Sequence, residues 1–204
     1  MVGFCYNRDG DILIHYPTKK NTLTKSTVNR AKLGMTLEED LNKTNHYYLE
    51  FNKAVIYKKP TPIQVVSVLY PQRSRAKITE AYYRSASTTD YNGVCQGVYI
   101  DFEAKETNHT TYFALAKIHS HQIEHLKRVA QHGGIAFLII RFSTLDVTYI
   151  VSIEQLCDFI ANHARRSIPV EWFKENAVPI PVSLTPPVDY LSVIQPWITK
   201  RSAL

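Results

Sequence analysis

Two acidic residues and a lysine form the most informative chemical pattern in this sequence: Asp90, Glu103 and Lys105. Side chains alternate along a β-strand, so Glu103 and Lys105 would lie on the same side of one strand. Two close carboxylates form a hard-oxygen site of the kind that Mg²⁺ prefers, and a neighbouring ammonium group can stabilise charge that develops on a phosphate. The pattern therefore predicts metal-assisted hydrolysis of a phosphodiester. The alternative interpretation is a surface ion pair worth about 0–1 kcal/mol.

Two features of the sequence should bring Asp90 close to Glu103. Asn92-Gly93 is a tight-turn signal, which predicts a hairpin between Asp90 and the strand that follows. In that strand apolar residues alternate with polar or charged ones: Val98, Ile100, Phe102 and Ala104 against Tyr99, Asp101, Glu103 and Lys105. Asp101 shares the face of Glu103 and is a rival metal ligand. We rank it below Asp90, because adjacent same-face positions lie roughly 7 Å apart whereas the oxygens around one Mg²⁺ converge at about 2.1 Å.

The charge of the chain is positive and unevenly placed. The sequence has 204 residues, 24 Lys and Arg against 18 Asp and Glu, a formal net charge of +6 and 45% hydrophobic residues, which excludes a disordered polycation. Residues 1–32 carry +4 and residues 53–85 carry +6, so the remainder carries −4. Clustered basic residues are typical of phosphate contact, although solvated surface charge also fluctuates by this much. The candidate DNA-binding residues of the second segment are Lys58, Lys59, Arg73, Arg75 and Lys77.

The cysteines and histidines bear on metals and on location. The three cysteines are far apart, at Cys5, Cys95 and Cys157. They form neither a C-x-x-C knuckle nor an even disulfide framework, so a reducing, cytoplasmic location is expected. The longest apolar runs are far shorter than the roughly 20 residues of a membrane helix, and no signal-peptide core is evident, so no membrane association is expected. Four histidines raise a zinc hypothesis: His119, His121, His125 and His132. Without paired cysteines, solvated or phosphate-facing histidines are favoured.

Periodicity and breaker residues predict an α/β fold with a mixed central sheet flanked by helices. Capping boxes at Thr36 and at Ser152 predict helices, the first over about 36–51 and the second with Leu156, Phe159 and Ile160 facing inward. The prolines of Lys59-Pro60-Thr61-Pro62 predict an extended excursion over about 59–80 that leaves the sheet. The other expected elements are strands at 54–57, 98–105, 135–142 and 146–151, and a helix that is capped by Ser120 and ends at Gly133-Gly134.

The expected domain organisation is simple. Residues 1–33 are interpreted as a basic, partly flexible N-terminal arm, and residues 34–204 as a single domain that includes the excursion. After Arg166 the chain becomes rich in proline, which predicts a segment that wraps this domain instead of forming a second one.

Longer blocks of sequence are more specific than the three residues alone. They include residues 34–42 (GMTLEEDLN), 58–62 (KKPTP), 87–93 (STTDYNG), 99–107 (YIDFEAKET) and 121–125 (HQIEH). Nearly continuous from residue 34 to about 135, they resemble the RecU family of Holliday junction resolvases of Gram-positive bacteria and their relatives. The spacing of Asp90, Glu103 and Lys105 also matches the PD-(D/E)xK nuclease signature.

The resemblance implies a restriction-endonuclease-like fold and a Mg²⁺ site in which Mn²⁺ can substitute. The implied ligands are Thr88, Asp90, Glu103 and Gln122, with Lys105 as the transition-state stabiliser. Glu38 is a weaker, supporting candidate, because the helix dipole explains an acidic residue in a first turn equally well. The resemblance further implies that the excursion is a stalk entering the centre of a four-way DNA junction, that two chains form a homodimer, and that a recombinase or branch-migration helicase is a protein partner.

The expected function is therefore a magnesium-dependent, structure-selective endonuclease that resolves four-way junctions by paired nicks in recombination and repair. One alternative is a less selective nuclease that acts on flaps or duplex ends. Another is a non-catalytic junction-binding or annealing accessory protein that modulates a recombinase. The intact Asp90, Glu103 and Lys105 argue against the loss of catalysis.

Overall fold

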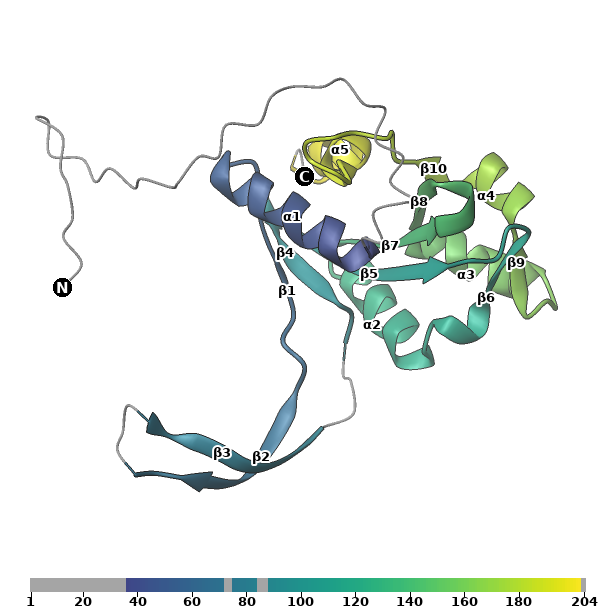
Figure 1. Ribbon diagram of the computed structural model, residues 1–204. Coiled ribbons are helices and arrows are strands. Elements are labelled where there is room, and N and C mark those ends of the chain that lie inside the picture. Colours follow the sequence, from purple (N-terminus) through teal and green to yellow (C-terminus); the bar gives the residue numbers. More distant parts are fainter. Residues whose placement is uncertain (1–35, 72–74, 84–87, 203–204) are drawn as a thin grey trace, which may run out of the picture.

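A mixed β-sheet forms the centre of the computed structural model, which describes residues 36–71, 75–83 and 88–202 (Figure 1). Within these residues six strands form the main sheet, in the order β1-β4-β5-β7-β8-β10. β5 and β7 run parallel, and the other neighbouring pairs are antiparallel. The strands are β1 Val55–Lys58, β4 Tyr91–Cys95, β5 Val98–Thr107, β7 Ile135–Phe142, β8 Val147–Ser152 and β10 Val178–Pro179. The expected mixed central sheet is confirmed.

Helices cover both faces of this sheet. α1 (Leu37–Glu50) and α5 (Tyr190–Ser202) pack on one face, and α2 (Ser120–Gln131), α3 (Ile153–Asn162) and α4 (Val170–Asn176) pack on the other (Figure 1). β7 divides its side chains between the two cores: Ile135, Phe137 and Ile139 face α1 and α5, while Ala136, Leu138 and Ile140 face α2 and α3. A strand covered on both faces reads as a continuous apolar run, which is what residues 135–140 are.

Smaller elements complete the body of the molecule. The short strands β6 (Tyr112–Ala114) and β9 (Ser167–Pro169) pair with each other. One-turn 3₁₀ segments, η3 (Leu115–Lys117) and η4 (Ser143–Leu145), follow β6 and β7. β6, η3 and α2 together make the crossover that two parallel neighbours such as β5 and β7 require.

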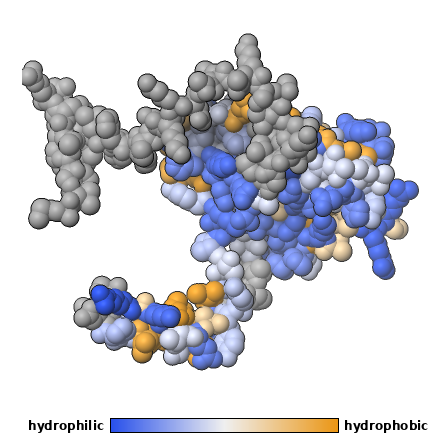
Figure 2. Space-filling view, viewed as in Figure 1, coloured by the Kyte–Doolittle hydropathy of each residue, from blue (hydrophilic) through white to orange (hydrophobic). Residues whose placement is uncertain are grey.

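The excursion leaves the main sheet, as expected. β2 (Ile63–Leu69) and β3 (Lys77–Tyr83) pair with each other as an antiparallel hairpin that projects from the β1 and β4 side of the sheet (Figure 1). We call residues 59–83 the stalk. Figure 2 shows apolar and polar residues mixed on the visible face of the stalk. Its exposed apolar side chains include Ile63, Val65, Val66, Leu69 and Ile78. A two-stranded ribbon has no core of its own, which explains this exposure.

The turn between β4 and β5 corrects one expectation. Asn92 and Gly93 lie inside β4, and the chain reverses at Gln96 and Gly97, whose φ angles are 51° and 79°. Two residues with positive φ are what a two-residue hairpin turn requires. Gly93 instead allows close strand packing, because a Cβ at this position would lie 2.0 Å from the carbonyl oxygen of Val55.

Three further expectations need correction. The residue that precedes α2 as its N-cap is His119 and not Ser120. Ile160, expected to face inward from α3, is 41% exposed. The proline-rich end does more than wrap the domain, since it contains α4 and α5, and Tyr190, Leu191, Ile194 and Ile198 of α5 are buried in the core.

Some expectations cannot be compared with the structure. The N-terminal arm of residues 1–33 and Arg73 lie outside the described residues. The division into an arm and one domain therefore stays a prediction. In the part of the chain that is described, no helix combines the length and the apolar character that crossing a bilayer demands.

Candidate active site

The β4–β5 hairpin places Asp90 beside Glu103. Tyr91 pairs with Phe102 in the antiparallel register, so the next positions outward, Asp90 and Glu103, are neighbours. The backbone N–H of Asp90 donates a hydrogen bond of 3.1 Å to Oε2 of Glu103. The N–H of Ala104, the next residue along β5, donates to Oδ2 of Asp90 over 3.4 Å. The expected meeting of the two carboxylates is therefore present, although the turn that produces it lies at Gln96-Gly97.

The ionised form of Glu103 is disfavoured by its surroundings. Its side chain is 0% exposed, and burial, with the nearby charge of Asp90 as the second cause, raises its pKa from 4.5 to about 7. Lys105, which forms an ion pair with Oε1 of Glu103, opposes this and lowers the pKa. A site that holds two carboxylates and one ammonium ion keeps an excess of negative charge, and a bound cation would relieve it.

Thr88 and Gln122, the two other implied ligands, belong to two other segments. Thr88 is half-buried and lies just before Asp90 in the loop that leads into β4. Gln122 is 4% exposed and lies in the first turn of α2, which packs against β5 and β7. Its Oε1 accepts a hydrogen bond of 3.0 Å from the backbone N–H of His119. A carbonyl oxygen has a second lone pair, so this bond leaves room for a metal contact.

The donor set fits a hard divalent cation better than zinc. Mg²⁺ takes one or two protein carboxylates and keeps several waters, and here two carboxylates lie together. Across the described ranges no three side chains of His, Cys, Asp and Glu gather as metal ligands. The rings of His119 and His121 stack on each other with centroids 5.4 Å apart. The zinc hypothesis therefore gains no support from the geometry.

Glu38 lies near the carboxylate pair. A cavity of about 190 Å³ at the N-terminus of α1 is lined by Thr36, Leu37, Glu38, Asp90, Tyr91, Ala104 and Glu106. The carboxylate of Glu38 forms an ion pair with Lys58, so it is already engaged by a cation from the end of β1. Its place in the cavity is compatible with a supporting role, which stays a prediction.

The candidate DNA-binding lysines and arginines have different surroundings. Lys58 pairs with Glu38, and both side chains are partly exposed. Lys59 is turned inward: its Nζ lies 2.9 Å from Oδ2 of Asp101 and 2.8 Å from Oγ1 of Thr89. Arg75 and Lys77 are exposed on the stalk. Net charge by segment cannot distinguish these cases, because it counts a cation that is neutralised inside the protein like one at the surface.

Asp101 is the polar residue whose surroundings the sequence revealed least. Strand alternation places it on the face of Glu103, but nothing in the sequence indicates that this face is covered by α2 and that Asp101 is 0% exposed. The sequence shows only an acidic residue in a strand and, far from it, a lysine at the start of the excursion, Lys59. Sequence alone does not show that the two meet.

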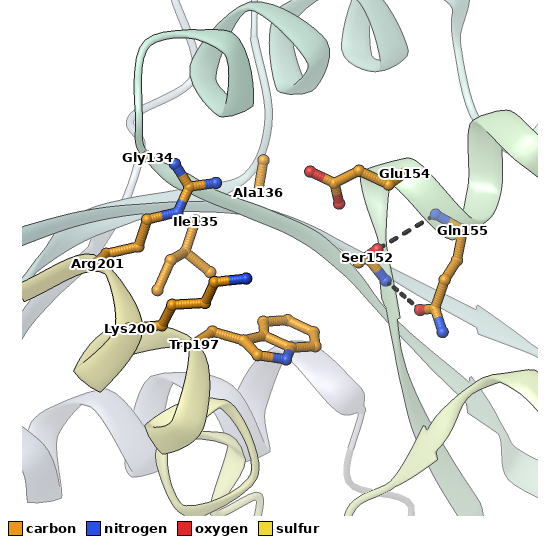
Figure 3. Close-up of a pocket in the computed structure, with 9 residues that line it drawn as sticks. All are labelled: Gly134, Ile135, Ala136, Ser152, Glu154, Gln155, Trp197, Lys200 and Arg201. Carbon is orange, nitrogen blue, oxygen red and sulfur yellow. Dashed lines mark hydrogen bonds between the residues drawn. The ribbon is translucent and has the colours of Figure 1, made fainter. Parts of the chain in front are cut away.

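A larger concavity lies elsewhere on the molecule and does not contain the carboxylate pair. It measures about 560 Å³ and is lined by Gly134, Ile135, Ala136, Ser152, Glu154, Gln155, Trp197, Lys200 and Arg201 (Figure 3). Lys200 and Arg201 extend into it from α5, whereas Glu154 and Gln155 belong to the first turn of α3. Because Asp90, Glu103 and Lys105 are absent from its lining, we do not place the chemistry there.

The carboxylates of Asp90 and Glu103 and the ammonium group of Lys105 lie together on a strand pair of a mixed sheet, which is the arrangement expected of a metal-dependent nuclease. Comparison with known proteins agrees with this class. The sequence model of the RecU family, described as Recombination protein U, matches residues 32–196. The chain belongs to the RecU family.

Individual relatives are similar over nearly their whole length. The protein named Holliday junction resolvase RecU in Geobacillus kaustophilus is 50% identical over 179 residues, which cover 86% of this chain and 90% of that protein. The protein of the same name in Streptococcus agalactiae is 46% identical over 190 residues, which cover 90% of this chain and 96% of that protein. A solved structure, the Holliday junction resolvase Hjc of Archaeoglobus fulgidus, matches with a TM-score of 0.38 and 8% identity over 68% of this chain and 93% of that one.

Proposed function

We propose that this protein is an endonuclease that resolves Holliday junctions in DNA recombination and repair, and that Mg²⁺ is its cofactor. The single observation that carries the chemistry is the meeting of Asp90, Glu103 and Lys105 on the β4–β5 hairpin. The substrate follows from the relatives, which share the name Holliday junction resolvase at 46–50% identity over most of both chains.

The residues of the site have separable roles in the proposed reaction. Asp90 and Glu103 would hold the cation, with Thr88 and Gln122 as neutral oxygen ligands, and Mn²⁺ would substitute. When bound, the cation supplies an acidified water and neutralises charge that grows on the phosphate. Lys105 holds its ammonium group against Glu103, where it is placed to stabilise the same charge on the phosphate. Burial of Glu103 lowers the local dielectric constant and strengthens both effects.

The stalk supports selectivity for a branched substrate. It projects away from the sheet next to the strands that carry the site, and it exposes Arg75 and Lys77 (Figure 1). We propose that it enters the central opening of the four-way junction, with Arg73, Arg75 and Lys77 as phosphate contacts. Lys58, at the end of β1 just before the stalk, is proposed as a further phosphate contact. Lys59 belongs to the same basic segment, but its ammonium group faces Asp101.

Symmetric resolution also constrains the assembly and its setting. Two equivalent cuts require two equivalent sites, which an isologous homodimer provides, so we propose that two chains act together. A recombinase or a branch-migration helicase is the proposed protein partner, since both work on the same junctions. Cys95 and Cys157 are free thiols in the described chain, in keeping with the proposed cytoplasmic location.

One assay separates this proposal from its alternatives. Purified protein is incubated with a mobile four-way junction and with a linear duplex of the same sequence, with Mg²⁺, with Mn²⁺ or with EDTA. We expect symmetric nicks in the junction when either metal is present, little cleavage of the duplex, and junction binding without cleavage for Asp90→Ala and Glu103→Ala. Equal cleavage of both substrates would indicate a less selective nuclease. Tight junction binding without metal-dependent cleavage by the wild type would indicate a non-catalytic accessory protein.

A further inference from the structure

Asp101 is a buried carboxylate that joins several separate parts of the site. Its side chain is 0% exposed. It lies on the same face of β5 as Glu103, and one residue separates the two in the strand. Among the described residues four side chains contact its two oxygens. Oδ1 accepts a hydrogen bond from Thr89, and Oδ2 lies 2.9 Å from Lys59 Nζ, from the hydroxyl of Tyr99 and from Nε2 of His125. We call Asp101 and these four side chains the Asp101 cluster.

The members of the Asp101 cluster come from the segments that carry the proposed metal ligands. Thr89 lies between Thr88 and Asp90 in the loop before β4. His125 lies three residues after Gln122 on α2, and residues three apart share a face of a helix. Asp101 itself lies two positions before Glu103 on β5. One carboxylate therefore connects the loop, the helix and the strand from which the four proposed ligands project.

Lys59 adds the root of the stalk to the same cluster. Its backbone N–H donates to the carbonyl oxygen of Asp90 over 2.8 Å, while its Nζ donates to Thr89 and to Asp101. Its side chain is only 19% exposed, so this ammonium group is not free to follow a DNA phosphate. The stalk is thus fixed to the loop of Asp90 by both the main chain and the side chain of one residue.

The contacts of Asp101 indicate support for the metal site, as distinct from direct coordination. An ionised carboxylate offers about four lone-pair positions, two on each oxygen. Lys59, Tyr99 and His125 crowd Oδ2, and Thr89 takes one position on Oδ1. A cation on Oδ2 would have to displace one of its three partners. A buried charge that loses a partner is costly. Each donor therefore helps to keep Asp101 fixed, and a fixed Asp101 in turn keeps the other donors in place.

We propose that Asp101 is a positioning residue, which holds the loop of Asp90 and the first turns of α2 at the distance from Glu103 at which their oxygens converge on one divalent cation. This inference rests on the proposed function, because it concerns the affinity of the proposed metal site. Groups that orient metal ligands typically contribute 10–100-fold to metal affinity or activity. The Asp101 cluster sets the affinity for the cation, while junction binding depends on other surfaces.

The test measures metal binding without DNA, on the full-length chain. Isothermal titration with Mn²⁺ is carried out on the wild type, Asp101→Asn, Lys59→Met and Thr89→Val. Junction binding in EDTA is measured by gel shift, and thermal unfolding in EDTA shows whether each variant is folded. Asp40→Asn is the matched control, because Asp40 is also a buried carboxylate with one cationic partner, Arg141, at 2.8 Å.

We expect Asp101→Asn and Lys59→Met to need about 10–100-fold more Mn²⁺ for half-saturation. Their junction affinity in EDTA should stay within about twofold of the wild type, and cleavage should recover as the metal concentration is raised. Thr89→Val removes one hydroxyl and keeps both charges, so it should show a smaller shift in the same direction. If Asp101→Asn does not fold, Lys59→Met and Thr89→Val give the answer.

Three results would overturn the proposal. Unchanged Mn²⁺ affinity in the folded variants would show that the Asp101 cluster does not support the site. An equal loss in Asp40→Asn would show a general effect of removing a buried charge. Cleavage that metal cannot restore in Asp101→Asn would make Asp101 a ligand itself. Failure of the proposed function looks different, because the wild type would then bind no Mn²⁺, or Glu103→Gln would bind it normally.

Discussion

Glu103→Gln should stabilise the metal-free protein at pH 8, although it removes a carboxylate from the candidate active site. Burial and the charge of Asp90 raise the pKa of Glu103 from 4.5 to about 7, even with Lys105 opposing them. A carboxyl group whose pKa is higher in the folded state contributes its stability below about pH 4.5, and this contribution is lost as the pH rises through about 7. At about 1.36 kcal/mol per pH unit, the loss amounts to about 3 kcal/mol.

Urea unfolding in EDTA at pH 5 and pH 8 measures this effect. Glutamine is neutral and similar in shape, so Glu103→Gln should be about 3 kcal/mol more stable than the wild type at pH 8 and differ by less than about 1 kcal/mol at pH 5. Glu50→Gln is the control, since Glu50 is an exposed carboxyl group on α1 that lies 3.8 Å from the imidazole ring of His46. It should change stability by no more than about 0.5 kcal/mol at either pH.

A bound metal ion should stabilise Glu103→Gln less than it stabilises the wild type. A cation at 100 times its dissociation constant stabilises the wild type by about 2.7 kcal/mol, and Glu103→Gln should gain far less. Because a bound cation requires the ionised carboxylate, Mn²⁺ affinity of the wild type should fall about tenfold per pH unit below pH 7. The reasoning is refuted if Glu103→Gln is less stable than the wild type at pH 8 in EDTA, or if metal stabilises both proteins equally.

Other predictions concern the sheet, the core and the stalk. Gly93→Ala should lower stability by more than about 2 kcal/mol, because its Cβ would lie 2.0 Å from the Val55 carbonyl oxygen; an unchanged urea midpoint would contradict this. Arg141→Leu should lower the free energy of unfolding by about 3–5 kcal/mol, because it leaves Asp40 buried and unpaired, and adding Asp40→Leu should restore much of this loss. If the effects of the two substitutions on stability simply add, the two residues do not act as a buried pair. Lys77→Ala on the stalk should weaken junction binding and reduce the slope of log K against log salt by about 1, and an unchanged slope would exclude a phosphate contact.

The sequence correctly predicted those helices and strands that short-range sequence signals determine. The capping boxes at Thr36 and Ser152 are present and begin α1 and α3, and the prolines after Lys59 do separate the stalk from the sheet. The Asn-Gly signal failed at residues 92–93 for a tertiary reason: β1 packs so closely on β4 that only glycine fits at Gly93. The reversal then occurred at Gln96-Gly97, a weaker signal that still tolerates positive φ.

The prolines after Arg166 do not exclude helices, since α4 and α5 both form in this segment. Pro196 lies inside α5, yet Tyr190, Ile194 and Ile198 repeat every four residues and are buried against the sheet. Packing of this apolar face outweighs the lost backbone hydrogen bond.

The sequence indicated which candidate residues come together, but it did not indicate their electrostatic surroundings. Spacing and alternation indicated Asp90, Glu103 and Lys105, since a hairpin and a strand fix them locally. Burial of Asp101 and the inward turn of Lys59 depend on α2 and on the return of the chain from the stalk, which join segments far apart in the sequence. Thr88 and Gln122 came from the family resemblance, and their coordination of a metal stays a prediction.

The most direct test of the central claim is cleavage of a four-way DNA junction by the full-length chain across a Mg²⁺ titration, with Asp90→Asn and Glu103→Gln alongside the wild type. We predict paired symmetric nicks by the wild type that require the metal, and a loss of about 10²–10³-fold or more in both variants with junction binding retained. Cleavage by the wild type in EDTA, or cleavage by either variant at the wild-type rate, would contradict a metal-dependent resolvase built on these two carboxylates.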